Sequence, residues 1–371
     1  MNYAQRVSRL AERLAELEVD CLLVGDRANV RYLSGFTGSA GALLIRATGA
    51  SGDHLFLSDF RYELQAAEEV ADCFAKGFTT AQEGQREVAD LLAERLAGAR
   101  RLGFEADRLT VSAQRRLAER LSGVELVGLE GTVAKLRRFK EAEEVERIAA
   151  AQALADQALK EVLEGGLGGR TEREVAIELA YRMRRLGAEG ESFPAIVASG
   201  PHGALPHAKA RDVEIAKGTL VTIDWGAQLD GYCSDCTRTY AVGRPSERAV
   251  EVYETVLAAQ RRALAGLRPG VAASAVDRLA RELIEQAGYG PRFGHSLGHG
   301  VGLEIHEAPR LGPPRPGEEE PELLAAGEVV TVEPGIYLPG ELGVRIEELV
   351  VVGEEGNRIL TSLPAQLTEL E

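Results

Sequence analysis

The sequence lacks several features that would place it in a specialised class of proteins. No stretch of its 371 residues approaches the roughly 18 consecutive apolar residues of a membrane span. Residues 1–20 show the charge-interrupted apolar stripe of an amphipathic helix rather than a signal peptide. Only four cysteines occur, too few and too scattered for a disulfide framework. We therefore expect a soluble, cytoplasmic protein with no membrane partner.

An excess of positive charge is also absent. The formal net charge is −15, the sequence pI is about 5.1, and no run of basic residues with interleaved aromatics occurs. A phosphate-binding surface normally concentrates Lys and Arg on one face, so nucleic acid is not an expected partner. Lysine itself is scarce, with six of the 43 basic residues. This skew towards arginine fits either a thermostable protein or a biased genome.

The length and a hydrophobic content of 45% allow two domains. In the first third, short apolar runs typical of buried strands alternate with helical patterns, which is the mark of an α/β layer domain. The runs lie at residues 21–25, 41–45, 54–57 and 102–105, and the helical patterns at 61–73, 83–96 and 112–121. A charged helical stretch then begins near residue 133. We predict an N-terminal α/β domain over residues 1–130 and a second domain over residues 131–371.

Two acidic residues stand out in a predicted β-hairpin. Residues 221–240 have the alternating pattern of two short strands joined at Asp230-Gly231, a dipeptide that tolerates positive φ at both positions. Each strand carries one aspartate, Asp224 and Asp235. A charge on a buried strand is costly unless it is paired, so two carboxylates that face each other across a hairpin require a cation.

The order helix, helix, strand, strand occurs twice in the second domain. The predicted helices cover residues 142–163, 171–186, 247–267 and 273–287, and the predicted strand pairs lie within 219–241 and 328–352. In the second copy, Glu333 and Glu347 follow Asp224 and Asp235 by 109 and 112 positions. A duplicated unit would place the hairpins face to face about a pseudo-twofold axis. The pattern therefore predicts four carboxylates at one centre.

Half of the six histidines lie between the two copies. The segment FGHSLGHGVGLEIHEAP, residues 293–309, contains His295, His299 and His306. Its glycines allow the backbone to pack closely beside a bulky centre. A single histidine is more often a core residue than a ligand, but three within twelve positions, beside four carboxylates, indicate a metal site.

Two other motifs are less specific. Cys233 and Cys236 form a C-x-x-C without a second pair, so two small strand residues are favoured over a zinc or redox site. The loop GFTGSAG, residues 35–41, lacks the G-K-[ST] ending of a P-loop. This favours a tight, close-packed turn over nucleotide binding.

The motifs around the acidic residues and histidines resemble those of the proline-specific pita-bread metallopeptidases, Xaa-Pro dipeptidase (prolidase) and Xaa-Pro aminopeptidase (aminopeptidase P). The similar segments are residues 222–239, GHSLGHGVGLEIHEAPR (294–310), VEPGIYLPG (332–340) and GVRIEE (343–348). NVRYLSGFTGSAG (29–41) and SDFRYELQAAEE (58–69) look like the creatinase-type N-terminal domain of the same enzymes. The resemblance spans the chain and implies a creatinase-type α/β domain followed by a pita-bread catalytic domain.

This resemblance implies the ligands of a dinuclear metal centre. They are Asp224, Asp235, His299, Glu333 and Glu347, with Asp235 and Glu347 bridging two divalent ions. Four carboxylates and one imidazole form a hard, oxygen-rich set that favours manganese or cobalt, although zinc is not excluded. Such ions acidify a water for attack on a scissile carbonyl.

Catalytic roles follow from the same resemblance. Glu333 matches the position that shuttles a proton as well as binding metal. His207 and His306 match histidines that contact the substrate carbonyl or the tetrahedral intermediate. His202 stands where an asparagine is common, which leaves the geometry of its loop open.

Substrate recognition is predicted from the chemistry of the Xaa-Pro amide. This amide has no N–H, so the enzyme must provide an apolar slot for the proline ring. Phe193 and the 292–295 segment with His295 are candidate walls. The free carboxylate of a dipeptide requires an arginine, and Arg310 resembles the carboxylate-binding arginine of short prolidases. Arg345, two residues before Glu347, is expected to hold ligand or substrate in place.

We therefore predict a hydrolase, a metal-dependent exopeptidase that cleaves the bond before proline and prefers dipeptides. Aminopeptidase P, which acts on longer peptides, is the alternative because it shares every motif quoted. Methionine aminopeptidase resembles only the second domain, creatinase works without the metal set, and an inactive peptide-binding relative would lack metal. A homodimer is the assembly that the resemblance implies.

Overall fold

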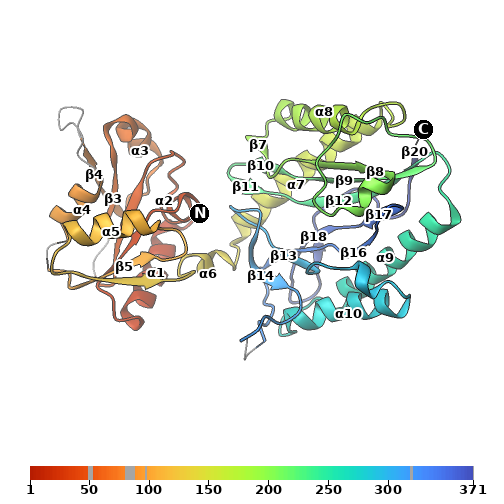
Figure 1. Ribbon diagram of the computed structural model, residues 1–371. Helices are drawn as coiled ribbons and strands as arrows, with labels where there is room; N and C mark the ends of the chain where they lie inside the picture. Colours follow the sequence, from red (N-terminus) through yellow and green to blue (C-terminus); the bar gives the residue numbers. More distant parts are fainter. Residues whose placement is uncertain (49–52, 80–87, 97, 318–320, 371) are drawn as a thin grey trace. The chain divides into compact units, whose positions relative to one another are not determined.

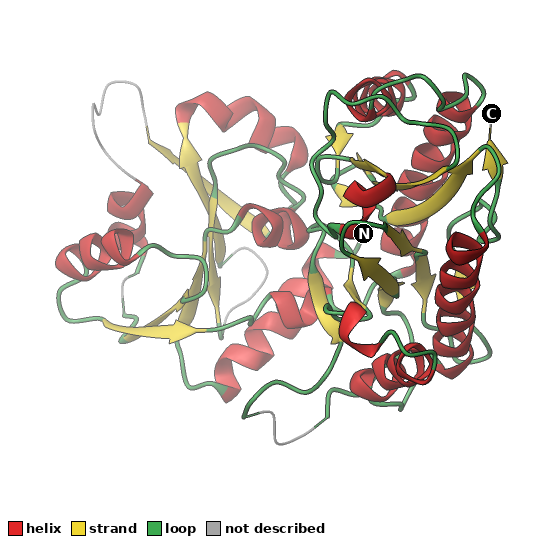
Figure 2. Cartoon of the chain, turned by 45° about the vertical axis from the view of Figure 1, so that its right-hand side comes forward, coloured by secondary structure: helices red, strands yellow, loops and turns green. Residues whose placement is uncertain are grey.

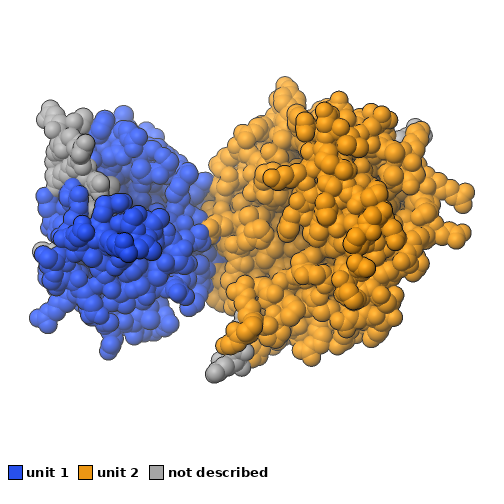
Figure 3. Space-filling model, viewed as in Figure 1, with its two compact units in different colours: residues 1–137 blue, residues 138–371 orange. Residues whose placement is uncertain are grey.

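The structure is a computed structural model that describes residues 1–48, 53–79, 88–96, 98–317 and 321–370 (Figure 1). It divides into two compact units, residues 1–137 and 138–371 (Figure 3). No helix in these described ranges is long and apolar enough to cross a membrane.

The first unit is an α/β layer domain built on a six-stranded sheet of order β4-β3-β2-β1-β5-β6. The strands are β1 (Cys21–Val24), β2 (Ala42–Arg46), β3 (His54–Asp59), β4 (Phe74–Thr79), β5 (Arg101–Glu105) and β6 (Glu125–Leu129). The helices are α1 (Tyr3–Glu16), α2 (Arg27–Ser34), α3 (Glu63–Glu69), α4 (Val88–Arg95), α5 (Val111–Arg120) and α6 (Ala134–Arg137). β2 runs antiparallel to β1 and β3, whereas β1, β5 and β6 are mutually parallel and β3 is parallel to β4.

The predicted alternation of strands and helices is confirmed in this unit. The N-terminal amphipathic segment forms α1, and burial of Val7, Leu10 and Leu14 stabilises its packing by about 1.5–3 kcal/mol each. The first part of the helix predicted at 83–96, residues 83–87, lies outside the described residues. The predicted tight turn follows α2. Gly35 there has φ 86°, and the packing is close, since a Cβ on Gly38 would lie 2.2 Å from the Phe36 ring.

In the second unit, helices lie around centrally placed strands (Figure 2). The helices are α7 (Ala142–Leu163), α8 (Glu172–Arg185), α9 (Glu247–Gly266) and α10 (Ala273–Gln286). The first copy of the duplicated unit contains β7 (Gly190–Glu191), β8 (Ile196–Ser199), β9 (Thr219–Trp225), β10 (Ala227–Leu229), β11 (Tyr232–Cys233) and β12 (Cys236–Val242). The second contains β13 (Gly298–Gly300), β14 (Glu307–Leu311), β15 (Val329–Val332), β16 (Gly335–Leu338), β17 (Leu342–Arg345) and β18 (Glu348–Val351), with β19 (Arg358–Ile359) and β20 (Glu369–Leu370) near the end.

Helix ends and one aromatic anchor position the helices of the first copy. Reciprocal capping boxes join Glu141 to Glu144 at the start of α7 and Thr171 to Glu174 at the start of α8. α7 is further tied to the sheet by Trp225, which is fully buried and donates its indole N–H to Ala155 O at 3.0 Å. The strands of the first copy are thereby fixed against α7.

Each copy contains a long β-hairpin that is interrupted halfway along its length. In the first hairpin, β9 pairs with β12 and β10 with β11, and the turn falls at Asp230-Gly231, with φ 48° and 76°. In the second hairpin, β15 pairs with β18 and β16 with β17. The predicted turn is confirmed, but the continuous strands expected on either side of it are each broken in two.

Candidate metal centre

The four carboxylates lie where the hairpin strands are interrupted. Asp224 is the penultimate residue of β9, and Glu333 directly follows β15. Asp235 and Glu347 directly precede β12 and β18. The expectation that all four stand within strands is therefore wrong for three of them. Outside the ladder, the backbone does not impose the strict alternation of side chains that a pleated strand requires.

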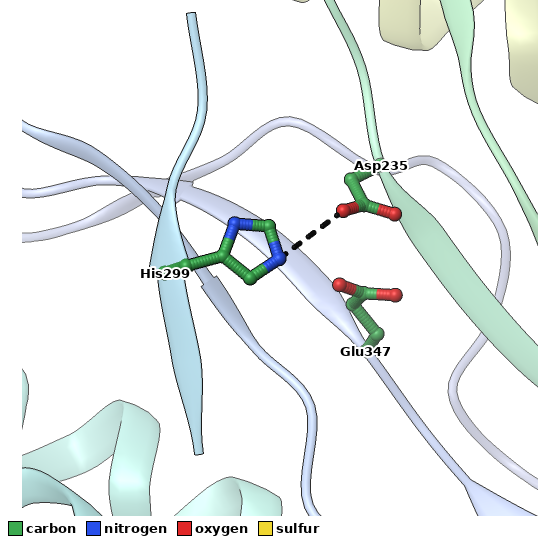
Figure 4. Close-up of side chains that lie close together, drawn as sticks. All are labelled: Asp235, His299 and Glu347. Carbon is green, nitrogen blue, oxygen red and sulfur yellow. Dashed lines mark ion pairs between the residues drawn. The ribbon is translucent and has the colours of Figure 1, made fainter. Parts of the chain in front are cut away.

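Asp235, His299 and Glu347 come together from three separate segments (Figure 4). One ligand atom of each lies within 4.8 Å of the others. His299 Nε2 is 3.5 Å from Asp235 Oδ2 and 3.5 Å from Glu333 Oε1. Four of the five predicted ligands thus form one cluster.

Asp224 adjoins this cluster through the first hairpin. It is paired with Thr237 across the β9–β12 ladder, and the Thr237 hydroxyl donates to Glu347 Oε2 at 2.7 Å. The backbone N–H of Glu347 in turn donates to Thr237 O at 3.0 Å. One threonine therefore joins a carboxylate of each hairpin.

The orientation of His299 leaves one ring nitrogen available. Its Nδ1 lies 3.0 Å from Gly300 O, and because a carbonyl only accepts, Nδ1 carries the proton. Burial lowers the pKa of His299 to about 4, so the ring is neutral at pH 7. The lone pair of Nε2 then faces the carboxylates, which is the arrangement of a metal-ligating imidazole whose other nitrogen is held by the backbone.

The carboxylates are buried against one another. Burial raises the pKa of Glu333 to about 8 and the pKa of Glu347 well above its usual range. For Asp235, burial and then the charge of Glu347 raise the pKa well above its usual range. A divalent cation among these groups would stabilise their charged forms and offset the repulsion.

One buried oxygen of the predicted ligand set has no donor among the described residues. Asp224 Oδ1 is buried without a hydrogen-bond partner, whereas Asp224 Oδ2 accepts from Arg345 Nη2 at 2.6 Å. An unpaired buried carboxylate oxygen is costly unless a cation completes it. The orphaned oxygen, the free Nε2 of His299 and the acidic cluster together fit divalent metal ions.

Arg345 is committed to protein acceptors. Besides Asp224, its guanidinium donates to Thr237 Oγ1 at 3.0 Å, Tyr337 Oη at 3.0 Å and Pro206 O at 3.2 Å. Four of the five N–H groups of an arginine are therefore used. The geometry places Arg345 as a support for the carboxylate cluster.

His295 belongs to the same network. Its Nδ1 lies 2.8 Å from Ser296 O, which makes Nδ1 the donor, and its Nε2 lies 2.9 Å from Tyr337 Oη. Burial lowers the pKa of His295 to about 4, so it is neutral at pH 7. A chain of contacts thus runs from His295 through Tyr337 and Arg345 to Asp224.

The two predicted catalytic histidines occupy exposed positions. The ring of His306 lies 4.3 Å from that of His299, which brings it to the edge of the cluster. His207 follows a short 3-10 turn, residues 200–204, and lies near Asp224. Burial raises the pKa of Asp224, and the charges of Arg345 and His207 oppose that rise only in part. The turn is fixed by His202, whose Nδ1 lies 3.0 Å from buried Glu172 Oε2.

The other substrate candidates are less tightly tied to the centre. Arg310 is the ladder partner of His299, and its Nη1 donates to Pro313 O at 2.7 Å. Phe193 lies half-buried between β7 and β8. Their roles towards substrate remain predictions.

Three supporting residues escaped the sequence analysis. Gln152 of α7 accepts the backbone N–H of Asp235 at 3.2 Å, Thr237 binds Glu347, and Tyr337 links His295 to Arg345. Thr237 and Tyr337 lie inside the motifs quoted above, which was the available signal. Gln152 lies in a helix more than 80 positions from its partner, and no local pattern marked it.

The C-x-x-C motif consists of two buried free thiols. Burial raises the pKa of Cys236 well above its usual range, and its Sγ faces Glu347 O at 3.5 Å. A thiol held in its protonated form is a poor metal ligand and nucleophile. The geometry supports the prediction that Cys233 and Cys236 are small strand residues.

Two family models match the chain. The model of metallopeptidase family M24 matches residues 146–354, and the model of the Creatinase/Prolidase N-terminal domain matches residues 6–139. Among curated relatives, the chain is 41% identical over 365 residues to an uncharacterized peptidase of Bacillus subtilis and 38% identical over 366 residues to the Xaa-Pro dipeptidase of Pyrococcus furiosus. Each alignment covers 98% of this chain and 99% of the relative.

Solved structures show the same likeness. An Xaa-Pro dipeptidase from Bacillus anthracis superposes with a TM-score of 0.93 at 39% identity, over 100% of both chains. An X-Pro aminopeptidase from Thermotoga maritima superposes with a TM-score of 0.86 at 38% identity, over 96% of this chain and 99% of the other. Both the architecture and the two-domain organisation are therefore shared with solved enzymes.

Proposed function

This chain belongs to metallopeptidase family M24, and from that membership we propose that it is a metal-dependent exopeptidase that hydrolyses Xaa-Pro dipeptides. One observation carries the proposal: a buried cluster of Asp235, His299 and Glu347 in a chain that matches an Xaa-Pro dipeptidase over nearly its full length.

We assign the binding of two divalent ions to the five residues predicted as ligands: Asp224, Asp235, His299, Glu333 and Glu347. Asp235 and Glu347, which precede equivalent strands of the two hairpins, would contact both ions. The hard donor set favours manganese or cobalt over zinc. When bound, the ions supply Lewis-acid polarisation of the scissile carbonyl and lower the pKa of a water.

The side chains of the chain itself hold the substrate and move the proton. Glu333 Oε1 accepts from Thr331 Oγ1 at 3.3 Å, so we assign the proton transfer from water to the amide nitrogen to Glu333 Oε2. His207 and His306, exposed beside the cluster, would donate to the carbonyl oxygen as negative charge develops there.

Recognition of proline would depend on shape and on one carboxylate contact. Phe193 and His295 would border the slot for the ring, which offers no N–H donor. Arg310 stands beside His299 in the β13–β14 ladder and would bind the carboxylate of a dipeptide.

Aminopeptidase P activity is the second candidate, because the Thermotoga maritima neighbour bears that name. The deciding experiment strips the enzyme of metal, restores it separately with manganese, cobalt or zinc, and compares Ala-Pro with Ala-Pro-Ala. A dipeptidase should give the larger kcat/KM on Ala-Pro. No cleavage of Ala-Pro with any of the three metals would reject the dipeptidase proposal.

The variant Arg310→Ala sharpens this comparison. It should raise KM for Ala-Pro roughly tenfold, since one charge-assisted contact is lost, and leave Ala-Pro-amide unaffected. An equal rise in KM for both substrates would show that Arg310 does not bind the substrate carboxylate.

We also propose a homodimer, by family resemblance. Light scattering of the purified protein should give twice the chain mass of 39.8 kDa. A mass of one chain at micromolar concentration would contradict it.

A further inference from the structure

A cavity of about 660 Å³ lies in the first unit, outside the catalytic unit. Its size is within the roughly 300–1,000 Å³ range of small-molecule sites. Its apolar lining includes Leu23, Leu92, Phe104, Leu109, Ala113 and Leu117. Its charged lining residues are Asp26, Arg27, Glu105, Asp107, Arg108 and Arg116.

The cavity lies at the carboxyl ends of two adjacent strands of the sheet. β1 and β5 are adjacent and parallel, and the residues Gly25, Asp26 and Asp107 that follow their carboxyl ends line the cavity. From its carboxyl end, β1 leads through α2 to β2 on one side, whereas β5 leads through α5 to β6 on the other. Connections that diverge in this way open a crevice, and such crevices are where open α/β sheets bind ligands.

The acidic groups of the lining already have partners among the described residues. Glu105 Oε2 accepts from the backbone N–H groups of Gly25 at 2.8 Å and Asp26 at 2.9 Å, and Glu105 Oε1 accepts from Asn29 Nδ2 at 2.6 Å. Asp26 and Asp107 face Arg108, at 3.5 Å and 3.8 Å from its guanidinium. These charges support the loops rather than face a ligand.

Two arginines of the lining differ from Arg108. Arg27 and Arg116 are exposed, and neither guanidinium has a hydrogen bond or an ion pair with another residue that the structure describes. The cavity therefore combines an apolar interior with two cations that are free to pair. This combination suits a molecule with an apolar body and an anionic end.

We propose that this cavity is a second binding site, for a small molecule with an apolar body and one carboxylate, sulfonate or phosphate group. The site is independent of the peptidase centre, since it lies wholly in the first unit. Its occupancy and the hydrolysis of Xaa-Pro peptides can be tested separately.

The test uses two fluorescent probes with the same aromatic body, anilinonaphthalene sulfonate and the uncharged N-phenyl-1-naphthylamine, titrated into the full-length protein. We expect one anionic probe to bind per chain, more tightly than the neutral probe. Absence of saturable binding by either probe would overturn the proposal.

Two variants locate the site, and each has a matched control on α5. Ala113→Phe fills the cavity and should weaken both probes by at least about tenfold, whereas exposed Ala118→Phe should change neither. Arg116→Ala should weaken only the anionic probe, by about three- to fivefold, whereas its exposed neighbour Arg115→Ala, outside the cavity, should have no effect.

Circular dichroism and thermal unfolding establish that each variant is folded. If Ala113→Phe does not fold, the Arg27→Ala and Arg116→Ala double variant decides, with an expected loss of about tenfold for the anionic probe alone. Unchanged binding in the folded cavity-filling variant, or equal effects of Arg115→Ala and Arg116→Ala, would place the probe elsewhere and reject the site.

Discussion

The two interrupted hairpins of the catalytic unit have the same layout but hold their carboxylates differently. The outer strands of the first hairpin have seven residues each and those of the second have four. The first supplies aspartates and the second glutamates, whose side chains are one methylene longer. The hairpin with the shorter outer strands is thus the one that carries the longer acids.

The supports of the carboxylates also cross between the hairpins. Asp224 of the first hairpin is bound by Arg345 of the second, and Glu347 of the second by Thr237 of the first. Neither hairpin holds its own acids unaided. The duplicated halves have become mutually dependent, and this dependence can be tested residue by residue.

The largest effect is expected from the two acids that precede β12 and β18. If the halves are equivalent, Asp235→Asn and Glu347→Gln should each remove bound metal and lower kcat/KM by at least about 1,000-fold, because each would weaken a carboxylate assigned to both ions rather than to one. Metal analysis by mass spectrometry and kinetics on Ala-Pro provide the readouts. Asp224→Asn should be milder, and an order with Asp224 as the most damaging would contradict equal roles for Asp235 and Glu347.

The second prediction concerns stability. Arg238 is fully buried and donates to Glu348 Oε1 at 2.8 Å and to Leu363 O at 2.7 Å, whereas the residue at the same place in the second hairpin is Val350. Arg238→Met should lower the free energy of unfolding by about 3–5 kcal/mol, since Glu348 is left buried and unpaired. Val350→Ala should lower the free energy of unfolding by only about 2 kcal/mol. Urea unfolding followed by circular dichroism measures both.

A double variant provides the control. Arg238→Met combined with Glu348→Leu removes both charges and should recover part of the loss. If the double variant is no more stable than Arg238→Met alone, the unpaired charge is not the cause.

The third prediction compares the helices that precede the hairpins. Glu172 at the start of α8 is buried, which raises its pKa, but hydrogen bonds from Arg211 and Ser199 outweigh burial and lower the pKa to about 2. The folded pKa lies below the unfolded value, so Glu172 stabilises the fold above pH 4.5, and this contribution is lost as the pH falls towards 2.

Glu172→Gln should therefore lower the free energy of unfolding by about 2–3 kcal/mol at pH 7, with a difference from wild type that shrinks below pH 4.5. The N-cap residue of α10 (Ala273–Gln286) is Ala272, which offers no side-chain cap, so Ala272→Ser should change the free energy of unfolding by at most about 1 kcal/mol at any pH. A Glu172→Gln effect that is independent of pH would refute the assignment.

The smallest effect separates two threonines. Thr237 donates to Glu347 at 2.7 Å, whereas Thr331 donates to Glu333 at 3.3 Å. Thr237→Val should weaken metal affinity by about tenfold, and Thr331→Val by about threefold at most. Competition with a fluorescent chelator measures the metal affinities. Thr237→Ser keeps the hydroxyl and should therefore restore the affinity that Thr237→Val loses. Equal losses for the two valine variants would show that hydrogen-bond length is not the cause.

Much of this architecture was predictable because the signals are local. Hairpin alternation and the Asp230-Gly231 turn predicted the first hairpin, and repetition of the element order predicted the second. The spacing of the repeat predicted that the four acids would meet, and the resemblance to the proline-specific metallopeptidases indicated which histidine would join them. The structure does bring Asp235, His299 and Glu347 together.

The remaining features depend on contacts distant in sequence. The strand breaks at Asp235 and Glu347 have no local signature, because neither glycine nor proline stands at those two positions. The acceptors of Arg345 come from three other segments, around residues 206, 224 and 237, and no local pattern specifies them. Sequence alone thus identified the acids and Arg345, but not the acceptors of Arg345 or the supports Gln152, Thr237 and Tyr337.

Arg345 has one further consequence. The same guanidinium that binds Asp224 also binds Pro206 O, the carbonyl that precedes His207. A cation bound at Asp224 would compete with Arg345 for this carboxylate, and through the bond to Pro206 O it would bias the position of the loop that carries His207. By thermodynamic reciprocity, a substrate that orders this loop would then alter cation affinity by the same factor. Cation binding at the carboxylate cluster and ordering of the loop that carries His207 would then be parts of a single linked equilibrium.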